Sequence, residues 1–143
     1  MHRECGTLVE LGGRRAVGKM KATITQRFGE AGAEYDVDCD CRFLFFCEKV
    51  GETAEASTSS WRVRYVKLLY EKDKVVPVCG GLPCFSTEEM EGLPEGYRYL
   101  GAAQRRCGYE IDGGLVTLRT VEGLKGMYAA VERWLEGGNA QLF

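Results

Sequence analysis

Two neighbouring segments of the chain alternate between apolar and polar residues with a period of two, which predicts half-buried β-strands. In residues 16–28 the apolar side carries Met20, Ala22, Ile24 and Phe28. In residues 35–47 one side carries Tyr35, Val37, Cys39, Cys41, Phe43, Phe45 and Cys47. The polar, glycine-bearing segment 29–34 between the two strands suits a hairpin connection.

One register of this hairpin matches both sides of both strands. Its polar pairs are Arg27–Asp36, Thr25–Asp38 and Thr23–Asp40, and its apolar pairs are Ile24–Cys39 and Ala22–Cys41. A register slipped by one residue would set apolar side chains against polar ones. We therefore interpret the three aspartates as a charged ladder on a solvated face of the sheet, in preference to a catalytic or cation-binding cluster.

A third strand is predicted over residues 61–70, and a resumption at residues 75–78 after a turn at "EKDK" stays open. The segment 51–60 before it is rich in serine and threonine and reads as a polar loop. Both faces of the strands become partly apolar towards one end. The even positions Leu44, Phe46, Val66 and Leu68 form an outer apolar patch, which predicts a homodimer through the outer face of the sheet.

The pattern changes to helix after residue 85. Ser86 and Glu89 have the spacing of a capping box, which starts a short helix. Residues 97–107 predict a second helix, and "IDGG" at residues 111–114 is typical of a turn. Residues 121–136 carry an apolar stripe with a helical period. The expected fold is α+β, a curved antiparallel meander with C-terminal helices packed on it.

Composition limits the choice of partners. The 143 residues fit a single domain, 1–143. They are 45% hydrophobic and 28% charged with a net charge of −2, which gives no electrostatic reason to expect nucleic acid or an anionic membrane as partner. No apolar run approaches the roughly 20 residues that span a bilayer, and the charged N-terminus does not resemble a secretory signal. We expect an intracellular, cytoplasmic protein.

The chain has seven cysteines, and an odd number leaves at least one thiol unpaired. A reducing cytosol would keep all of them free, and free cysteine behaves as a small buried hydrophobe. Cys39 and Cys41 form a C-x-C pair, but a closed zinc site needs four ligands and the single histidine, His2, lies at an end expected to be disordered. We expect no metal and no cofactor; a cysteine-based metal or redox role is the minor alternative.

The position of that histidine also argues against Ser-His-Asp or Cys-His catalysis. Acid–base chemistry in an apolar pocket is left. If the odd sides of the second and third strands face inward, the catalytic candidates are Tyr35, Tyr65 and Lys67. The pocket would then be lined by Gln26, Cys39, Cys41, Trp61 and Val63. Lys67 would either extend to the rim or be desolvated with a lowered pKa.

Several strings resemble fungal proteins of the SnoaL-like group in the NTF2-like superfamily. They are "ITQRF", "YDVDCDCRFLFFC", "WRVRYVKLLYEKDKVVPV", "PEGYRYLGAAQ" and the late "MY..VERWL". The resemblance covers roughly residues 5 to 137 and is strongest over residues 70–78 and 94–104. It implies a cone, in which a curved antiparallel sheet wraps around helices and leaves a pocket.

The resemblance also implies a range of functions, since such domains include cyclases, dehydratases, isomerases and non-catalytic modules, and many dimerise through the sheet. The chain departs from the pattern because only about fifteen residues precede the first expected strand, where helices usually plug the cone, and because it has no interior histidine. We expect binding of a small, largely apolar molecule, with lyase, isomerase or cyclase chemistry left open. The alternative is a non-catalytic dimerisation or scaffold module.

Overall fold

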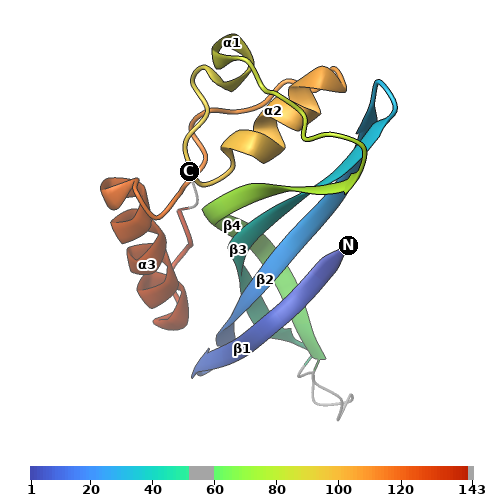
Figure 1. The fold of residues 1–143 in the computed structure, drawn as a ribbon. Helices are drawn as coiled ribbons and strands as arrows, with labels where there is room; N and C mark the ends of the chain where they lie inside the picture. Colours follow the sequence, from blue (N-terminus) through green and yellow to red (C-terminus); the bar gives the residue numbers. More distant parts are fainter. Residues whose placement is uncertain (52–59, 142–143) are drawn as a thin grey trace.

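Four antiparallel strands form a single curved sheet in the order β1-β2-β3-β4 (Figure 1). The computed structural model describes residues 1–51 and 60–141. The strands are β1 (His2–Gly12), β2 (Arg15–Glu30), β3 (Ala33–Val50) and β4 (Ser60–Cys79). Three helices follow: α1 (Thr87–Met90), α2 (Arg98–Arg106) and α3 (Val121–Leu135). The expected curved antiparallel sheet with C-terminal helices is confirmed. The polar loop expected at residues 51–60 falls almost entirely outside the described residues.

The described residues form one strand more than the sequence pattern predicted, because the N-terminal residues form β1. Gly13, with a φ of 59°, lies in the turn into β2. Nearly every residue of β1 is exposed, so its alternation carries little apolar signal. The expectation of a disordered N-terminus was wrong. His2 belongs to β1, and its ring lies 5.8 Å from the ring of Phe43.

The predicted register of β2 against β3 is confirmed. Arg27 pairs with Asp36, and their side chains form an ion pair with a 2.8 Å N–O distance. The Thr25 and Thr23 hydroxyls donate hydrogen bonds of 2.6 and 2.7 Å to the carboxylates opposite them. Ala31 and Gly32 form the turn, both at positive φ, as a tight hairpin that follows the twist of the strands requires.

The strand β4 runs without interruption through "EKDK", so the expected turn there is absent from this part of the chain. Three register shifts interrupt its pairing with β3, and the first lies at its C-terminal end, between the partners of Glu34 and Tyr35. The other two lie between the partners of Asp40 and Cys41 and between those of Phe46 and Cys47. Because each bulge adds a residue to β4 alone, the odd positions of β3 pair with even positions of β4 between these last two bulges. The expectation that the odd sides of both strands face one pocket was therefore wrong.

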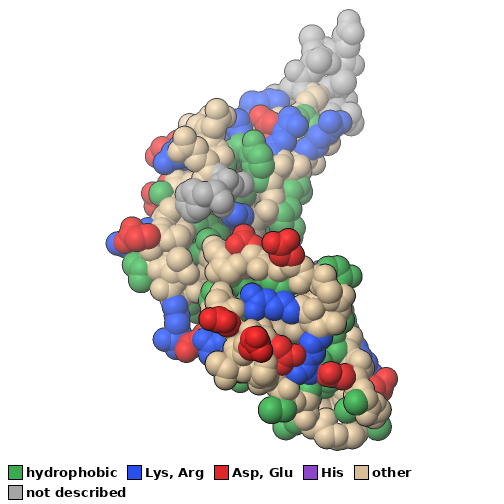
Figure 2. Space-filling view, turned by 90° about the horizontal axis from the view of Figure 1, so that it is seen from above, with side chains coloured by type: hydrophobic (Ala, Val, Ile, Leu, Met, Phe, Trp, Pro, Cys, Tyr) green, Lys and Arg blue, Asp and Glu red, His purple; other side chains and the backbone are tan. Residues whose placement is uncertain are grey.

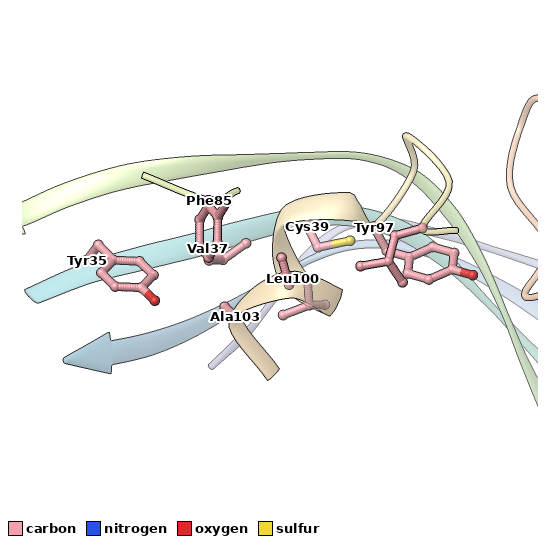
Figure 3. Packing of buried hydrophobic residues seen from close by; sticks show 9 residues of the cluster. Tyr35, Val37, Cys39, Phe85, Tyr97, Leu100 and Ala103 are labelled. Carbon is pink, nitrogen blue, oxygen red and sulfur yellow. The ribbon is translucent and has the colours of Figure 1, made fainter. Parts of the chain in front are cut away.

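The helices pack on opposite faces of the sheet at its two ends. We call the face that carries Tyr35, Val37 and Cys39 the α2 face, because α2 packs there with Leu100 and Ala103 (Figure 3). The other face is the α3 face. Its buried residues are Val17, Leu44, Phe46 and Leu69, which pack with Met127, Val131 and Trp134 of α3. In Figure 1, α3 lies beside the lower half of the sheet, and α1 and α2 lie at the upper end of the sheet.

The lower half of the α2 face has no helix on it (Figure 1). The strand register places three rows of four residues there. The rows are Thr7–Met20–Phe43–Leu68, Val9–Gly18–Phe45–Val66 and Leu11–Ala16–Cys47–Val63. None of these twelve positions is charged. We call this block the open apolar face.

The open apolar face replaces the apolar patch expected from the sequence. Leu44 and Phe46 are 3% and 0% exposed beneath α3, whereas Val66 and Leu68 lie on the opposite face. The expected patch is therefore split between the two faces, because the bulges in β4 change which positions share a side.

Charged side chains also surround α1 and α2. Figure 2 views the molecule from that end, where basic and acidic side chains are interspersed. Arg106 forms an ion pair with Glu89 there. Among the described residues, no helix is both long and apolar enough to cross a bilayer.

Candidate functional site

A groove of about 370 Å³ lies on the α3 face, where the first three strands meet α3. The residues that line it come from β1, β2, β3 and α3; they are Gly6, Thr7, Leu8, Lys19, Met20, Lys21, Arg42, Leu44 and Tyr128. Its volume falls within the range of about 300–1,000 Å³ that small-molecule sites have. This groove is our candidate functional site.

The strand register explains why these side chains meet. Leu8 pairs with Lys19, and Lys19 pairs with Leu44, so the three lie side by side across the sheet. The next row consists of Gly6, Lys21 and Arg42. Side chains that are paired across strands project from the same face. Each strand thus contributes one position to each row, and the groove combines the two leucines of one row with basic side chains from both rows.

Tyr128 closes the groove from α3. Its neighbour Met127 is buried against the sheet together with Trp134, whose Nε1 donates hydrogen bonds to the carbonyl oxygens of Ala16 and Cys47 at 3.2 and 3.1 Å. These contacts fix the helix, and Tyr128, one position further on, extends to the edge of the packed interface. Its hydroxyl oxygen lies 3.1 Å from a guanidinium nitrogen of the sheet, which donates a hydrogen bond to it.

Arg42 is the donor of that hydrogen bond and the best-connected cation of the groove. It also forms an ion pair with Glu71. Burial alone would lower the pKa of Arg42, but its hydrogen bonds to Glu71 and to Tyr128 outweigh the burial, so the pKa is raised. The guanidinium therefore stays charged at every physiological pH and holds the Tyr128 hydroxyl in place.

The two lysines of the groove differ in their partners. Lys19 forms an ion pair with Glu10 at 2.8 Å, and its ammonium lies 5.5 Å from the centre of the Tyr128 ring. Lys21 is exposed and makes no hydrogen bond or ion pair with any described residue. One lysine is thus held against the wall, and the other is available to a ligand.

The three catalytic candidates from the sequence do not come together. Tyr35 is 2% exposed on the α2 face, where its ring contacts Phe85 and burial raises its pKa. Tyr65 pairs with Phe46 on the α3 face, eleven positions further along β3, which corresponds to roughly 35 Å. Lys67 lies in the same row as Leu44, beside the groove wall. A shared pocket of Tyr35, Tyr65 and Lys67 is therefore not formed.

The five residues expected to line that pocket are also dispersed. Gln26 accepts a hydrogen bond of 3.1 Å from the side chain of Gln104 in α2. Trp61 and Val63 are 46% and 54% exposed at the start of β4. Cys39 and Cys41 are buried within the sheet. None of the five lines the groove.

The "CDC" cysteines act as apolar strand residues. The Cys39 thiol donates a weak hydrogen bond to the carbonyl oxygen of Gly96, and that of Cys41 does so to Ala22, each at 3.5 Å. Burial raises the pKa of both thiols, that of Cys41 to about 11. Within the described part of the chain, no three His, Cys, Asp or Glu side chains are grouped so as to hold a metal ion.

The sequence reading missed every residue that lines the groove. The only local signal for the groove was the even side of β3, which turns apolar at Leu44 and Phe46 directly after Arg42. That change marks the point where a helix begins to cover the face. The contribution of Tyr128 depends on a contact that spans 86 positions of sequence, which no local pattern contains.

The chain is similar to several fungal proteins. A PEP2-like protein from Fusarium vanettenii is 38% identical over 157 aligned positions, covering 99% of this chain. Pea pathogenicity protein 2 from the same fungus is 39% identical over 150 positions and 96% of this chain. An uncharacterised protein from Emericella nidulans is 36% identical over 152 positions.

No family model matches the chain. The chain spans about 60% of the length of the curated relatives it matches: 62%, 60% and 61% for these three proteins. The similarity is therefore to part of each relative, and it connects the chain to a group of fungal proteins.

Proposed function

We propose that the groove on the α3 face binds a small, largely apolar molecule. The observation that carries the proposal is the pairing of an apolar wall, Leu8 and Leu44, with the polar groups of Lys19, Arg42 and Tyr128 in one volume of about 370 Å³. Small-molecule sites combine a mostly apolar lining with a few polar groups that orient the ligand.

A neutral apolar fluorophore, N-phenyl-1-naphthylamine, tests this proposal by titration. Leu8 and Val9 supply a matched pair of variants, because they are neighbours in β1, 57% and 58% exposed, and project from opposite faces. Leu8→Gln is expected to weaken binding roughly fivefold, since it removes apolar contact worth ~1 kcal/mol. Val9→Gln is expected to leave the affinity unchanged. Equal affinities in both variants would refute the groove as the binding site.

The same proposal includes the finer expectations of a SnoaL-like cone and of acid–base chemistry. The curved antiparallel sheet supports the former. For the latter, the groove offers the phenol of Tyr128 and the ammonium of Lys19, which are side-chain types that exchange protons in lyases and isomerases. Tyr128→Phe would abolish turnover of a substrate, because phenylalanine has no phenolic proton to exchange.

A second candidate function is self-association through the open apolar face. Its twelve uncharged positions include Val9, Leu11, Val63 and Val66, which are between 47% and 71% exposed. Patches of large exposed apolar side chains mark interfaces. We propose a second copy of this chain as the occupant, because a two-fold interface joins a patch to itself and an uncharged apolar patch is complementary to itself.

Light scattering coupled to size exclusion tests the second candidate. Val66 lies in the central row of the open apolar face, and Val66→Glu is expected to convert a dimer to a monomer. Val121→Glu is the matched control, because Val121 is 56% exposed at the first position of α3, where a carboxylate is favourable. A monomeric wild-type chain, or a dimer that survives Val66→Glu, would refute this interface.

A further inference from the structure

We infer that the molecule bound in the groove carries a negatively charged head group, held by Lys21 and Tyr128. This inference rests on the proposed function and adds the chemical class of the ligand to it. It is carried by an excess of positive charge and by two hydrogen-bond donors that line the same groove.

Lys21 and Arg42 are direct partners across β2 and β3, and both project from the α3 face. Like charges directly opposite each other destabilise a sheet unless something neutralises them. Glu71 neutralises Arg42 through an ion pair. Lys21 has no such partner among the described residues. An anionic ligand at Lys21 would relieve this repulsion.

The charges around the groove do not cancel. Three cations line it, namely Lys19, Lys21 and Arg42. Two carboxylates pair with them, Glu10 with Lys19 and Glu71 with Arg42. One positive charge therefore remains, so a singly charged anion complements the groove.

Tyr128 supplies the second donor. Its hydroxyl oxygen accepts a hydrogen bond from Arg42, so the hydroxyl proton is directed away from the guanidinium. No described residue accepts that proton. A phenol that accepts from a cation is also a stronger donor, because hydrogen bonds in a chain polarise one another. The proton is thus suited to an oxyanion beside Lys21.

Access to this end of the groove comes from β1. Gly6 occupies the β1 position of the row that contains Lys21 and Arg42, and a Cβ placed on Gly6 would meet nothing within 4 Å. The head group can therefore reach Lys21 past a residue that has no side chain. The apolar body of the ligand would then lie along the next row, against Leu8 and Leu44.

Two fluorophores that differ only in a charged head group measure its contribution to binding. 8-Anilino-1-naphthalenesulfonate has the same aromatic body as N-phenyl-1-naphthylamine and adds one sulfonate, which stands in for a carboxylate or another singly charged oxyanion. The wild-type chain is expected to bind the sulfonate probe about tenfold more tightly than the neutral probe, because one charge-assisted hydrogen bond contributes a free energy of that size. Lys21→Met and Tyr128→Phe are expected to reduce that preference, measured as the ratio of the affinities of each variant for the two probes.

Lys125→Met is the matched control, because Lys125 is an exposed lysine of α3 whose one ion-pair partner among the described residues is Glu122. It is expected to keep the preference. The inference of an anionic head group is overturned if the wild-type chain binds both probes equally, or if the preference persists in Lys21→Met and Tyr128→Phe. Either result leaves the groove proposal standing. If neither probe binds, both proposals fail. Val9→Gln reports any binding of either probe to the open apolar face.

Discussion

The carboxylate of Asp73 in β4 accepts a hydrogen bond of 2.8 Å from the backbone N–H of Leu100 in the first turn of α2. The residue that precedes the helix, Tyr97, makes no capping hydrogen bond with its side chain. A strand residue distant in the sequence therefore supplies the acceptor that a helix N-terminus needs. Burial raises the pKa of Asp73 to about 6, and the hydrogen bonds from Leu100 and Tyr99 offset only part of this effect.

Because the pKa of Asp73 is raised above its unfolded value of 3.8, its contribution to stability is fully present below pH 4 and is lost as the pH rises through 6. We expect the free energy of unfolding of the wild type, relative to Asp73→Asn, to fall on the order of 2–3 kcal/mol over that interval. Asparagine keeps the acceptor and cannot ionise. Urea unfolding at pH 4, 5, 6 and 7 measures the difference, and parallel pH profiles of the two proteins would contradict the assignment.

Arg106 joins four parts of the chain. Its guanidinium forms ion pairs with Glu30 at the end of β2 and with Glu89 in α1, donates a hydrogen bond to the carbonyl oxygen of Cys84 and lies 4.3 Å from the centre of the Phe85 ring. Arg106→Met is expected to lower the free energy of unfolding by about 2 kcal/mol, the cost of removing a charge-assisted donor. Urea unfolding at pH 7 is the measurement.

Arg133→Met is the matched control, because Arg133 also lies in the last turn of a helix but, in the part of the chain that the structure describes, hydrogen-bonds to Gln141 alone. It is expected to change stability by less than about 0.5 kcal/mol. Since the bond from Arg106 holds the pKa of Glu89 at about 2, the stability that this pair confers is present above pH 4.5 and is lost as the pH falls towards 2. Equal effects of the two substitutions would show that Arg106 is an ordinary surface cation.

Phe45 and Phe46 are adjacent in β3 but belong to different environments. Phe46 is fully buried beneath α3, and its ring lies 6.0 Å from that of Trp134, whereas Phe45 is half-buried in the open apolar face. Phe46→Ala is expected to cost about 3–5 kcal/mol of unfolding free energy. Phe45→Ala is expected to cost clearly less, about 1–2 kcal/mol, because part of the ring is already hydrated. A larger loss in Phe45→Ala would mean that the two faces are assigned the wrong way round.

Thiol reactivity separates the cysteines by burial. The exposed thiols of Cys5, Cys79, Cys84 and Cys107 are expected to react with iodoacetamide in the folded protein. Cys39 and Cys41 are expected to react only after unfolding, because burial and a raised pKa keep their thiolate populations low. Peptide mass spectrometry after timed alkylation measures both groups. Fast labelling of Cys39 would show that the sheet opens there.

Local pattern was sufficient for the hairpin of β2 and β3 and for the start of α1. The pairing of Arg27 with Asp36 followed from side-chain complementarity, since a one-residue slip inverts every side chain. The capping box of Ser86 and Glu89 is equally local, and both of its hydrogen bonds are present, at 2.6 and 3.2 Å. Interactions of this kind leave a signature within a few residues.

The groove could not be predicted in the same way, because it depends on structural features that the alternation of apolar and polar residues does not show. Bulges in β4 changed the face of Tyr65 and Lys67 relative to Tyr35. An edge strand with almost no buried positions supplied Leu8. Tyr128 looked like one more member of an apolar stripe, and only the crossing of α3 over β3 places it beside Arg42.

Because α2 and α3 pack on opposite faces of the sheet, we expect the two halves of the molecule to open independently of each other. Each helix seals its own hydrophobic core, one with Tyr35, Val37 and Cys39 and the other with Leu44 and Phe46, and β3 passes through both. Either cap can open while the strand hydrogen bonds of the other half persist. Amide exchange is then expected to proceed in two separate steps, with the middle of β3 as the slowest-exchanging segment because it lies between the two cores, where Cys41 is buried with Ala22 and Ile24.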